Sequence, residues 1–213
     1  MPSSLGRAVR PFLVSYTTNA VTSPEPARTR GRRTRAAILE QAVALFARRG
    51  MDDVSLAEVA EAAGVFPSQI TYYFASKPAL FVHAAFALLL RDAERLERIG
   101  RRQRTPEAFR TALARAALAL PSVPVATQAL AVAAHRPELH AAVQRDLTLL
   151  FRSAQRYLEQ VLAEQDWVVD RTPDVETRTF WSTVLGARLV SESGFGGRSA
   201  ELDLAGVLTV RSR

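Results

Sequence analysis

Residues 57–81 read AEVAEAAGVFPSQITYYFASKPALF, and this stretch decides the fold of the N-terminal half of the chain. A single glycine, Gly64, separates two short segments in which apolar residues recur three and four positions apart, as in amphipathic helices. The second segment ends with three aromatic residues, Tyr72 to Phe74, just before the only lysine of the chain, Lys77. Two short helices that meet at one glycine predict a helix-turn-helix.

Local signals predict where these two helices begin and end. Ser55 and Glu58 fit a capping box, in which each side chain accepts a hydrogen bond from the backbone N–H of the other residue. Gly64 suits the left-handed position after the first helix. Pro67 suits the first position of the second helix, which we expect to end at Phe74.

The outer side of the second helix carries groups that suit contacts with DNA, because in a helix-turn-helix this side enters the major groove. Gln69 can form two hydrogen bonds with an adenine edge, and the tyrosine hydroxyls can reach phosphates. The alternative for Tyr72 and Tyr73 is a structural role, in which they cover the junction with the next helix. Lys77 adds its charge to the N–H groups that begin the next helix, where a phosphate is well received.

Positive charge is concentrated near the N-terminus of the chain. Of the net charge of +7, most comes from residues 1–35, which contain seven arginines and one acidic residue, Glu25. Such a segment favours a polyanion, with nucleic acid ahead of membrane, although many basic tails are only solvated. Residues 1–33 lack periodicity and are expected to be a disordered extension, with order beginning near Thr34.

Composition excludes several classes of function. The chain has 213 residues, 48% of them hydrophobic, so it can bury a sizeable core. The absence of cysteine excludes disulfides, thiolate metal sites and cysteine nucleophiles. No run of about eighteen apolar residues occurs, and the N-terminus lacks the apolar centre of a secretory signal. We therefore expect a soluble cytoplasmic protein with no membrane partner.

Apolar residues beyond Thr34 recur at helical spacing throughout, and no segment shows sustained alternation, so the predicted fold class is all-α. The expected helices span residues 34–49, 55–63, 67–74, 76–98, 105–120, 125–134, 137–164, 173–192 and 200–210, with a linker at 194–199.

No constellation of catalytic or metal-binding residues is recognisable. His135 and His140 lie five positions apart across Pro137, which does not place both on one helical face, and no carboxylate completes a metal triad. The glycines at 194–197 do not follow a predicted strand, so they do not form a phosphate-binding loop. We predict no enzyme activity, no cofactor and no metal.

Three segments resemble a known family: TRAAILEQAVALFARRG at 34–50, SLAEVAEAAGV at 55–65 and ITYYFASKPALF at 70–81. With these motifs the chain resembles the tetracycline-repressor (TetR) family of one-component regulators. After the basic extension at 1–33, the resemblance implies a helix-turn-helix DNA-binding domain at 34–80 and an effector-binding and dimerisation domain at 81–213. It also implies a homodimer that releases its DNA operator when a small effector binds. A dimer with recognition helices about 34–36 Å apart predicts a palindromic operator in double-stranded DNA. The apolar residues expected around the effector favour a hydrophobic ligand.

The same resemblance, taken with the residue chemistry, gives a set of DNA-binding candidates. They are Arg30, Arg32, Arg33, Arg35, Ser55, Phe66, Pro67, Ser68, Gln69, Thr71, Tyr72, Tyr73 and Lys77. The sequence departs from the family pattern at two of these positions. Phe66 stands where a serine usually caps the recognition helix, and Thr71 stands where a tyrosine is usual. The cap is therefore expected to be weaker, and base preference is not transferable from a relative.

Two further sets of candidates lie in the C-terminal half. The expected effector cavity is lined by Phe86, Leu89, Leu90, Phe109, Leu113, Gln128, Leu130, His135, Phe151 and Arg188. The expected dimer interface contains Leu147, Phe151, Leu158, Phe180, Trp181, Val184, Leu185 and Leu189, which form apolar stripes on two long helices. The alternative for both sets is that these residues close the core of one chain.

Three functions remain open at this point. The first is a ligand-responsive DNA-binding regulator, most simply a repressor, although an activator would share the same helix-turn-helix domain. The second is a helical interaction protein of the same fold without specific DNA binding, which would have no salt-dependent affinity for a duplex. The third is an enzyme on a helical scaffold, which would have to turn over a bound ligand.

Overall fold

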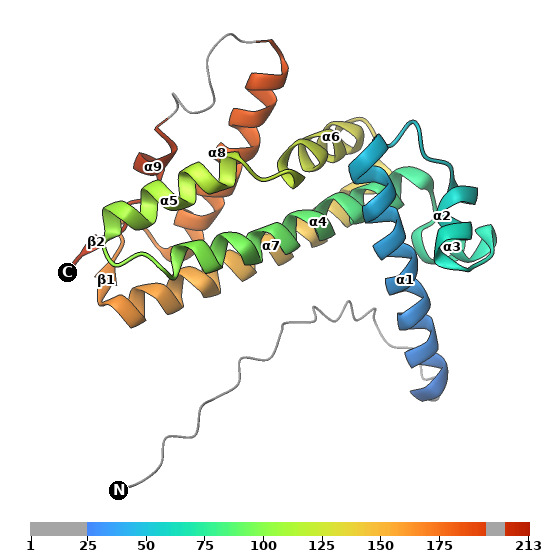
Figure 1. The fold of residues 1–213 in the computed structure, drawn as a ribbon, viewed down its shortest axis with the longest axis horizontal. Coiled ribbons are helices and arrows are strands. Elements are labelled where there is room, and N and C mark those ends of the chain that lie inside the picture. The colour runs from blue at the N-terminus through green and yellow to red at the C-terminus, as the bar shows by residue number, and fades with distance from the viewer. Residues whose placement is uncertain (1–24, 195–202) are drawn as a thin grey trace, which may run out of the picture.

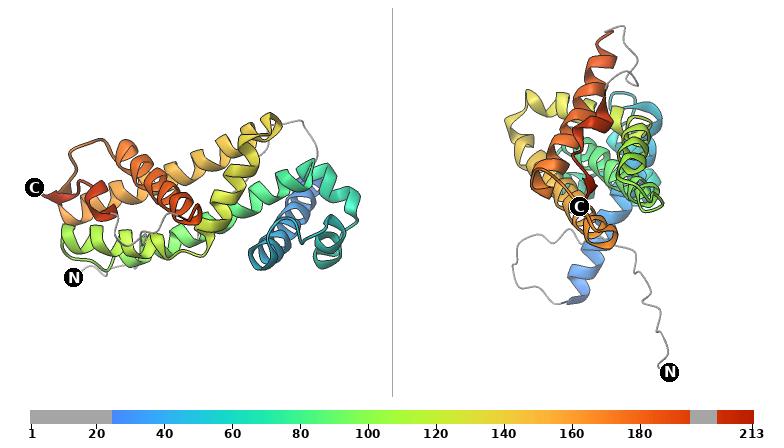
Figure 2. Two further views of the ribbon diagram at one scale, coloured as in Figure 1. Left: turned by 90° about the horizontal axis from the view of Figure 1, so that it is seen from above. Right: turned by 90° about the vertical axis from the view of Figure 1, so that its left-hand side faces the viewer.

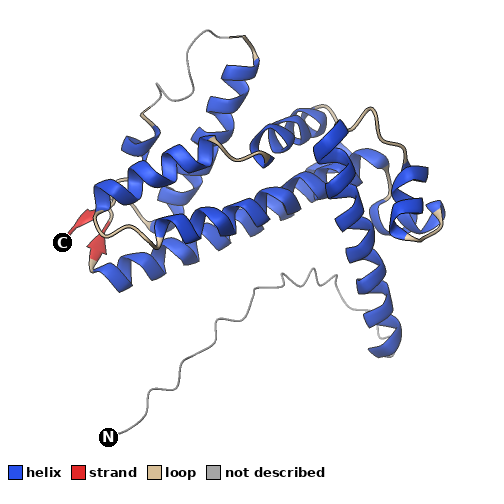
Figure 3. Cartoon of the chain, in the orientation of Figure 1, coloured by secondary structure: helices blue, strands red, loops and turns tan. Residues whose placement is uncertain are grey.

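The computed structural model describes residues 25–194 and 203–213, and nine helices account for most of them, so the predicted all-α class is confirmed (Figure 3). The helices are α1 (Glu25–Arg49), α2 (Leu56–Ala63), α3 (Pro67–Phe74), α4 (Lys77–Gly100), α5 (Pro106–Leu118), α6 (Ser122–Ala134), α7 (Pro137–Gln165), α8 (Pro173–Glu192) and α9 (Leu204–Val207). Two short strands, β1 (Trp167–Val168) and β2 (Arg211–Ser212), form an antiparallel pair.

The molecule is elongated, with α1, α2 and α3 at one end and the β1–β2 pair at the other (Figures 1 and 2). The long helices α4 and α7 connect the two ends and run in the same direction. Near their starts, His83 of α4 pairs with Asp146 of α7, and just beyond the end of α4, Arg101 contacts Glu164 near the end of α7. The two helices therefore form a rod that runs from the helix-turn-helix to the opposite end of the molecule, and α5, α6 and α8 pack along it.

The predicted limits of α2 and α3 and the predicted start of α4 are confirmed by their caps, whereas α4 ends at Gly100, two residues beyond the predicted end. Ser55 Oγ accepts from the Glu58 N–H at 3.1 Å, and the Glu58 carboxylate accepts from the Ser55 N–H at 2.7 Å. Gly64 adopts the left-handed conformation after α2, with φ 64° and ψ 38°. Pro67 opens α3, and Ser76 caps α4 by accepting from the Ala79 N–H. Each of these signals acts over four residues or fewer, so the sequence alone is enough to locate it.

The first helix is longer than predicted, because α1 begins at Glu25 instead of near Thr34. Thr34 does not cap a helix: its hydroxyl donates to the carbonyl oxygen of Arg30, one turn earlier, at 3.0 Å. The early start of α1 is consistent with the sequence, since arginine favours helices and Pro26 suits a first turn. The remainder of the predicted extension, residues 1–24, lies outside the described residues.

The predicted helix at 200–210 is wrong. Among the described residues 203–210, only the four of α9 are helical, and the chain after them is extended, with Trp167 opposite Ser212 and Val168 opposite Arg211. The signal missed in the sequence is a short alternation, because Leu208 and Val210 are buried on either side of Thr209. Residues 195–202, which include most of the predicted linker, lie outside the described part of the chain.

The tail is held by a buried carboxylate, Glu176 of α8. Its oxygens accept hydrogen bonds from the Arg171 Nε at 2.8 Å, the Thr209 N–H at 3.0 Å and the Thr209 hydroxyl at 2.5 Å. Arg171 also donates to the carbonyl oxygen of Val207. A fully buried charge is tolerated only when it is paired in this way, so these bonds fix the tail against α8.

Among the described residues, no single helix combines the length and the hydropathy needed to span a membrane. Two pairs of consecutive helices, α3 with α4 and α5 with α6, meet that test only when taken together, and each pair is sharply bent.

We expect Glu176→Ala to lower the free energy of unfolding by about 3 kcal/mol, because it leaves Arg171 and the Thr209 N–H without their shared acceptor. Urea unfolding followed by circular dichroism measures this change. Asp170→Asn is the matched control, because its ion pair with Arg211 is exposed and should contribute less than about 1 kcal/mol. Equal losses from the two variants would contradict a special role for the buried carboxylate.

Candidate DNA-binding surface and effector cavity

The two sides of the recognition helix α3 differ as the sequence predicted. Ile70 and Phe74 are buried on the inner side, against the core that α2 also contributes to. On the outer side, Ser68 and Thr71 are exposed, and Tyr72 is 83% exposed. Just before the helix, Phe66 is 77% exposed. Polar and aromatic groups therefore share one accessible surface.

Gln69 has a second role that the sequence analysis missed. Its side-chain Oε1 accepts a hydrogen bond from the Phe66 N–H at 3.0 Å. This bond is the reciprocal half of a capping box, and it compensates for the missing serine at the position of Phe66. The side chain predicted to read a base thus also holds the start of its own helix.

The two tyrosines of α3 occupy different environments. Their rings meet edge to face, with centroids 5.0 Å apart. Tyr73 packs on the core, and its hydroxyl lies 3.3 Å from where a Cβ would stand at Gly31 of α1. Tyr73 therefore covers a junction, as in the structural alternative, but the junction is with α1. Tyr72 stays accessible and remains the DNA-facing candidate of the two.

Basic candidates fall into two groups. Arg30, Arg32 and Arg33 are exposed on the first turns of α1, where they remain available to a polyanion. Arg35 and Lys77 instead support the helix-turn-helix itself. The Arg35 guanidinium lies over the ring of Phe74 at 4.7 Å, and Lys77 Nζ donates to the carbonyl oxygen of Asp52 at 3.3 Å.

The capping box of α2 carries a strongly shifted carboxyl group. Hydrogen bonds from the backbone and the hydroxyl of Ser55, together with the Arg49 guanidinium 2.8 Å away, lower the pKa of Glu58 to about 2. Ser55, predicted to contact DNA, is exposed, but its hydroxyl oxygen is used by this cap. The ion pair also ties the end of α1 to the start of α2.

A cavity of about 40 Å³ lies in the C-terminal half of the molecule. Two of the predicted effector residues line it, Phe109 and Leu113, together with Ala93, Leu96, Glu97, Ala154, Tyr157, Leu158, Thr177, Phe180, Trp181 and Leu208. This volume holds a few water molecules at most, whereas sites for drug-sized ligands measure about 300–1,000 Å³. A ligand of that size would have to widen the cavity.

The polar groups of the cavity wall come from residues that the sequence analysis missed. The Tyr157 hydroxyl is buried and has no hydrogen-bond partner among the described residues. Burial raises the pKa of Tyr157, so the phenol stays protonated and can donate. Burial also raises the pKa of Glu97, against the opposing effect of Arg101. Gly100 makes room for this arrangement, because a Cβ there would overlap the Tyr157 hydroxyl.

The other predicted effector residues do not line this cavity. Phe86 and Leu89 are buried in the core, and Gln128 and His135 are exposed. Arg188 forms an ion pair with Glu192 at 2.9 Å. The remaining three, Leu90, Leu130 and Phe151, are partly buried against the core.

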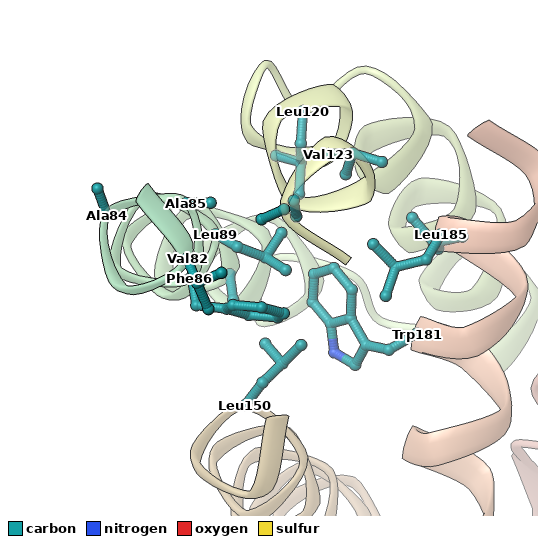
Figure 4. Packing of buried hydrophobic residues seen from close by; sticks show 14 of the residues in the cluster. Val82, Ala84, Ala85, Phe86, Leu89, Leu120, Val123, Leu150, Trp181 and Leu185 are labelled. Carbon is teal, nitrogen blue, oxygen red and sulfur yellow. The ribbon is translucent and has the colours of Figure 1, made fainter. Parts of the chain in front are cut away.

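Five of the predicted dimer residues are buried in the core of one chain, as in the alternative given for them: Leu158, Phe180, Trp181, Val184 and Leu185. Figure 4 shows Trp181 reaching from α8 toward Phe86, Leu89 and Leu150. Leu147 and Phe151 are partly buried, and Leu189 is exposed. The same helix also exposes Val175 and Val190, which the sequence analysis did not select.

Comparisons with known proteins agree with this architecture. A family model described as "Bacterial regulatory proteins, tetR family" matches residues 38–84, and a model described as "Bacterial transcriptional repressor C-terminal" matches residues 106–209. A comparison with curated protein sequences gives no significant match.

Solved structures show the same fold. A protein assigned as a transcriptional regulator from Rhodococcus sp. RHA1 is 31% identical, with 82% of this chain and 93% of that chain covered and a TM-score of 0.66. The multidrug binding protein EbrR, solved with imidazole, is 22% identical, with 84% and 91% covered and a TM-score of 0.54. FadR from Thermus thermophilus, a TetR-family repressor solved with lauroyl-CoA, is 22% identical, with 81% and 88% covered and a TM-score of 0.54.

The fold and the helix-turn-helix define a DNA-binding transcriptional regulator. The two family models and the Rhodococcus structure show that the chain belongs to the tetracycline-repressor (TetR) family.

We expect the Glu58 capping box to make stability depend on pH in the acid range. The pKa of Glu58 is lowered from 4.5 to about 2, so its contribution is fully present above pH 4.5 and is lost as the pH falls toward 2. Urea unfolding of the wild type and Glu58→Gln should therefore show midpoints that differ at neutral pH and converge near pH 2. Glu61→Gln, an exposed change in the same helix, is the control. A Glu58→Gln difference that stays constant with pH would refute this assignment.

Proposed function

We propose that this protein is a repressor that binds a palindromic operator as a homodimer and leaves it when a small, mainly hydrophobic effector binds. The observation that carries the proposal is the outer surface of α3. Phe66 and Tyr72 are large, exposed aromatic residues beside the exposed hydroxyls of Ser68 and Thr71. Exposed apolar groups beside polar ones mark interaction sites, and this combination suits thymine methyl groups, sugars and phosphates.

Charge near this surface supports DNA as the partner. Arg30, Arg32 and Arg33 are exposed on the first turns of α1, and Tyr73 of α3 packs beside Gly31 in the same turns. These arginines are therefore close to the reading helix and can neutralise phosphates that flank its site. Lys77 lies at the start of α4, where its side chain can exchange the Asp52 carbonyl for a phosphate.

An exposed apolar side of α8 supports the dimer. Val175, Leu189 and Val190 are exposed there, and Gly186, also exposed, has open space at its Cβ position. Pairing this side with its twofold copy would bury these residues in an isologous interface. A dimer of this kind would place two recognition helices about 34–36 Å apart, which matches two half-sites one helical turn apart.

The cavity supports an effector that is mainly apolar with at least one polar group. Its wall is mostly apolar, and the protonated hydroxyl of Tyr157 can donate a hydrogen bond to a ligand. Because α4 lines the cavity and also begins at the helix-turn-helix, a ligand that widens the cavity can change the spacing of the recognition helices. Such a ligand releases DNA if it binds more tightly to the conformation in which this spacing is altered.

The first test is to select fragments of source genomic DNA on the purified full-length protein at physiological salt, and to sequence what is retained. We expect one enriched palindrome upstream of a small number of genes. Retention without enrichment would contradict an operator-specific function, and no retention of any duplex would favour a helical interaction protein. The enriched duplex then serves in sedimentation measurements, where one dimer should bind each palindrome.

We expect Gln69→Ala and Lys77→Ala to affect DNA binding differently. Gln69→Ala should reduce discrimination at one base pair of each half-site by about 1–3 kcal/mol. Lys77→Ala should weaken all duplexes alike and reduce the slope of log K against log salt by about 0.9 per protomer. Fluorescence anisotropy over a salt series, with the enriched duplex and a scrambled one, measures both effects. Identical behaviour of the two variants would contradict this division of roles.

A further inference from the structure

A buried pair of ionisable side chains joins the two long helices near the helix-turn-helix. His83 Nδ1 of α4 lies 2.8 Å from Asp146 Oδ2 of α7, and the two side chains are 9% and 1% exposed. The second oxygen of Asp146, Oδ1, is buried without a hydrogen-bond partner among the described residues. Asp146 therefore depends on His83 to satisfy its buried charge.

The imidazole of His83 also contacts the recognition helix. Its ring meets the ring of Phe74, the last residue of α3, with centroids 5.8 Å apart and an interplanar angle of 61°. Arg35 of α1 lies over the same Phe74 ring. A continuous series of side-chain contacts therefore crosses α1, α3, α4 and α7, through Arg35, Phe74, His83 and Asp146. We call it the α1–α7 contact series.

Stability alone does not explain a polar link at this position. Burying a carboxylate and an imidazole costs desolvation, and apolar residues of similar size usually hold two helices together equally well or better. The helices already share an apolar core that includes Phe86 and Leu150 (Figure 4). A hydrogen-bonded pair adds one defined geometry, because its strength falls when distance or angle changes.

The same helix that holds Asp146 forms part of the cavity wall. Ala154, Tyr157 and Leu158 line the cavity and lie two to three turns after Asp146 on α7. A displacement of this segment by a ligand would move Asp146 along with it, since both lie on one continuous helix. The α1–α7 contact series would then transmit the movement to Phe74.

We propose that His83 is a positioning residue, which fixes the orientation of the recognition helix relative to α7 through Phe74 on one side and Asp146 on the other. The cavity and the recognition helix are then coupled in two ways, directly along α4 and through α7, Asp146 and His83. Its effect on operator affinity rests on the proposed function, whereas its effect on the mobility of α3 does not.

The experiment is amide hydrogen exchange on the full-length protein without DNA. Asp146→Asn keeps the size of the side chain but removes its charge, and we expect it to speed exchange within α3 by about fivefold. The control is Asp92→Asn, a second buried aspartate, on α4, which accepts from the Ser122 N–H and pairs with Arg95 instead of His83. It should leave α3 within about twofold of the wild type after correction for global stability.

A second variant separates transmission from a general loss of packing. Phe74→Leu removes the ring that His83 touches but leaves the His83–Asp146 pair in place. In this background Asp146→Asn should no longer change exchange in α3, although it still loosens α4 against α7. The proposal is overturned if Asp146→Asn and Asp92→Asn affect α3 alike, or if Asp146→Asn acts on α3 equally with and without Phe74.

DNA affinity provides a separate measurement. Asp146→Asn should weaken binding to the selected palindrome by about tenfold and leave binding to a scrambled duplex of equal length within about twofold, because phosphate contacts are unchanged. Equal weakening on both duplexes would count against a positioning role. If no palindrome is selected, the repressor proposal fails while the exchange measurement still decides the role of His83.

Discussion

The burial of Ile70 and Phe74 on the inner side of α3 is the contact on which the function of the N-terminal half depends. Because these two residues are spaced four apart, they fix one side of a short helix in the core. The opposite side, with Ser68, Thr71 and Tyr72, then faces the solvent. A helix of eight residues has little stability of its own, so its exposed side chains acquire a defined direction only through this packing.

Local interactions explain why α2, α3 and α4 could be located from the sequence. Ser55 with Glu58, Gly64 and Pro67 each act within one turn of helix and have the predicted role, and Ser76 caps α4 at its predicted start. The tail shows the opposite case. Thr209 is held by Glu176, more than thirty positions earlier, and no pattern in the sequence pairs them. Because this contact is distant in sequence, the local pattern predicts a helix at 200–210 where the chain after α9 is extended.

The C-terminal candidates were less predictable for the same physical reason. An apolar stripe such as that of Phe180, Trp181 and Val184 shows that a helix side is buried, but not whether the cover comes from the same chain or from a partner. Here the cover comes from the same chain. The polar groups of the cavity were missed because Tyr157 becomes significant only beside Gly100, which lies at the end of a different helix, beyond the predicted range of that helix.

The bond between Gln69 and the Phe66 N–H has a consequence for how base preference can change in this protein. If Gln69 contacts a base, its oxygen must either be shared or leave the start of the recognition helix, so recognition and helix folding compete for one acceptor. Substitutions at Gln69 are then constrained by folding as well as by the operator. Ser68 and Thr71 take no part in this bond, so substitutions that change operator preference cost the recognition helix least at those two neighbouring positions.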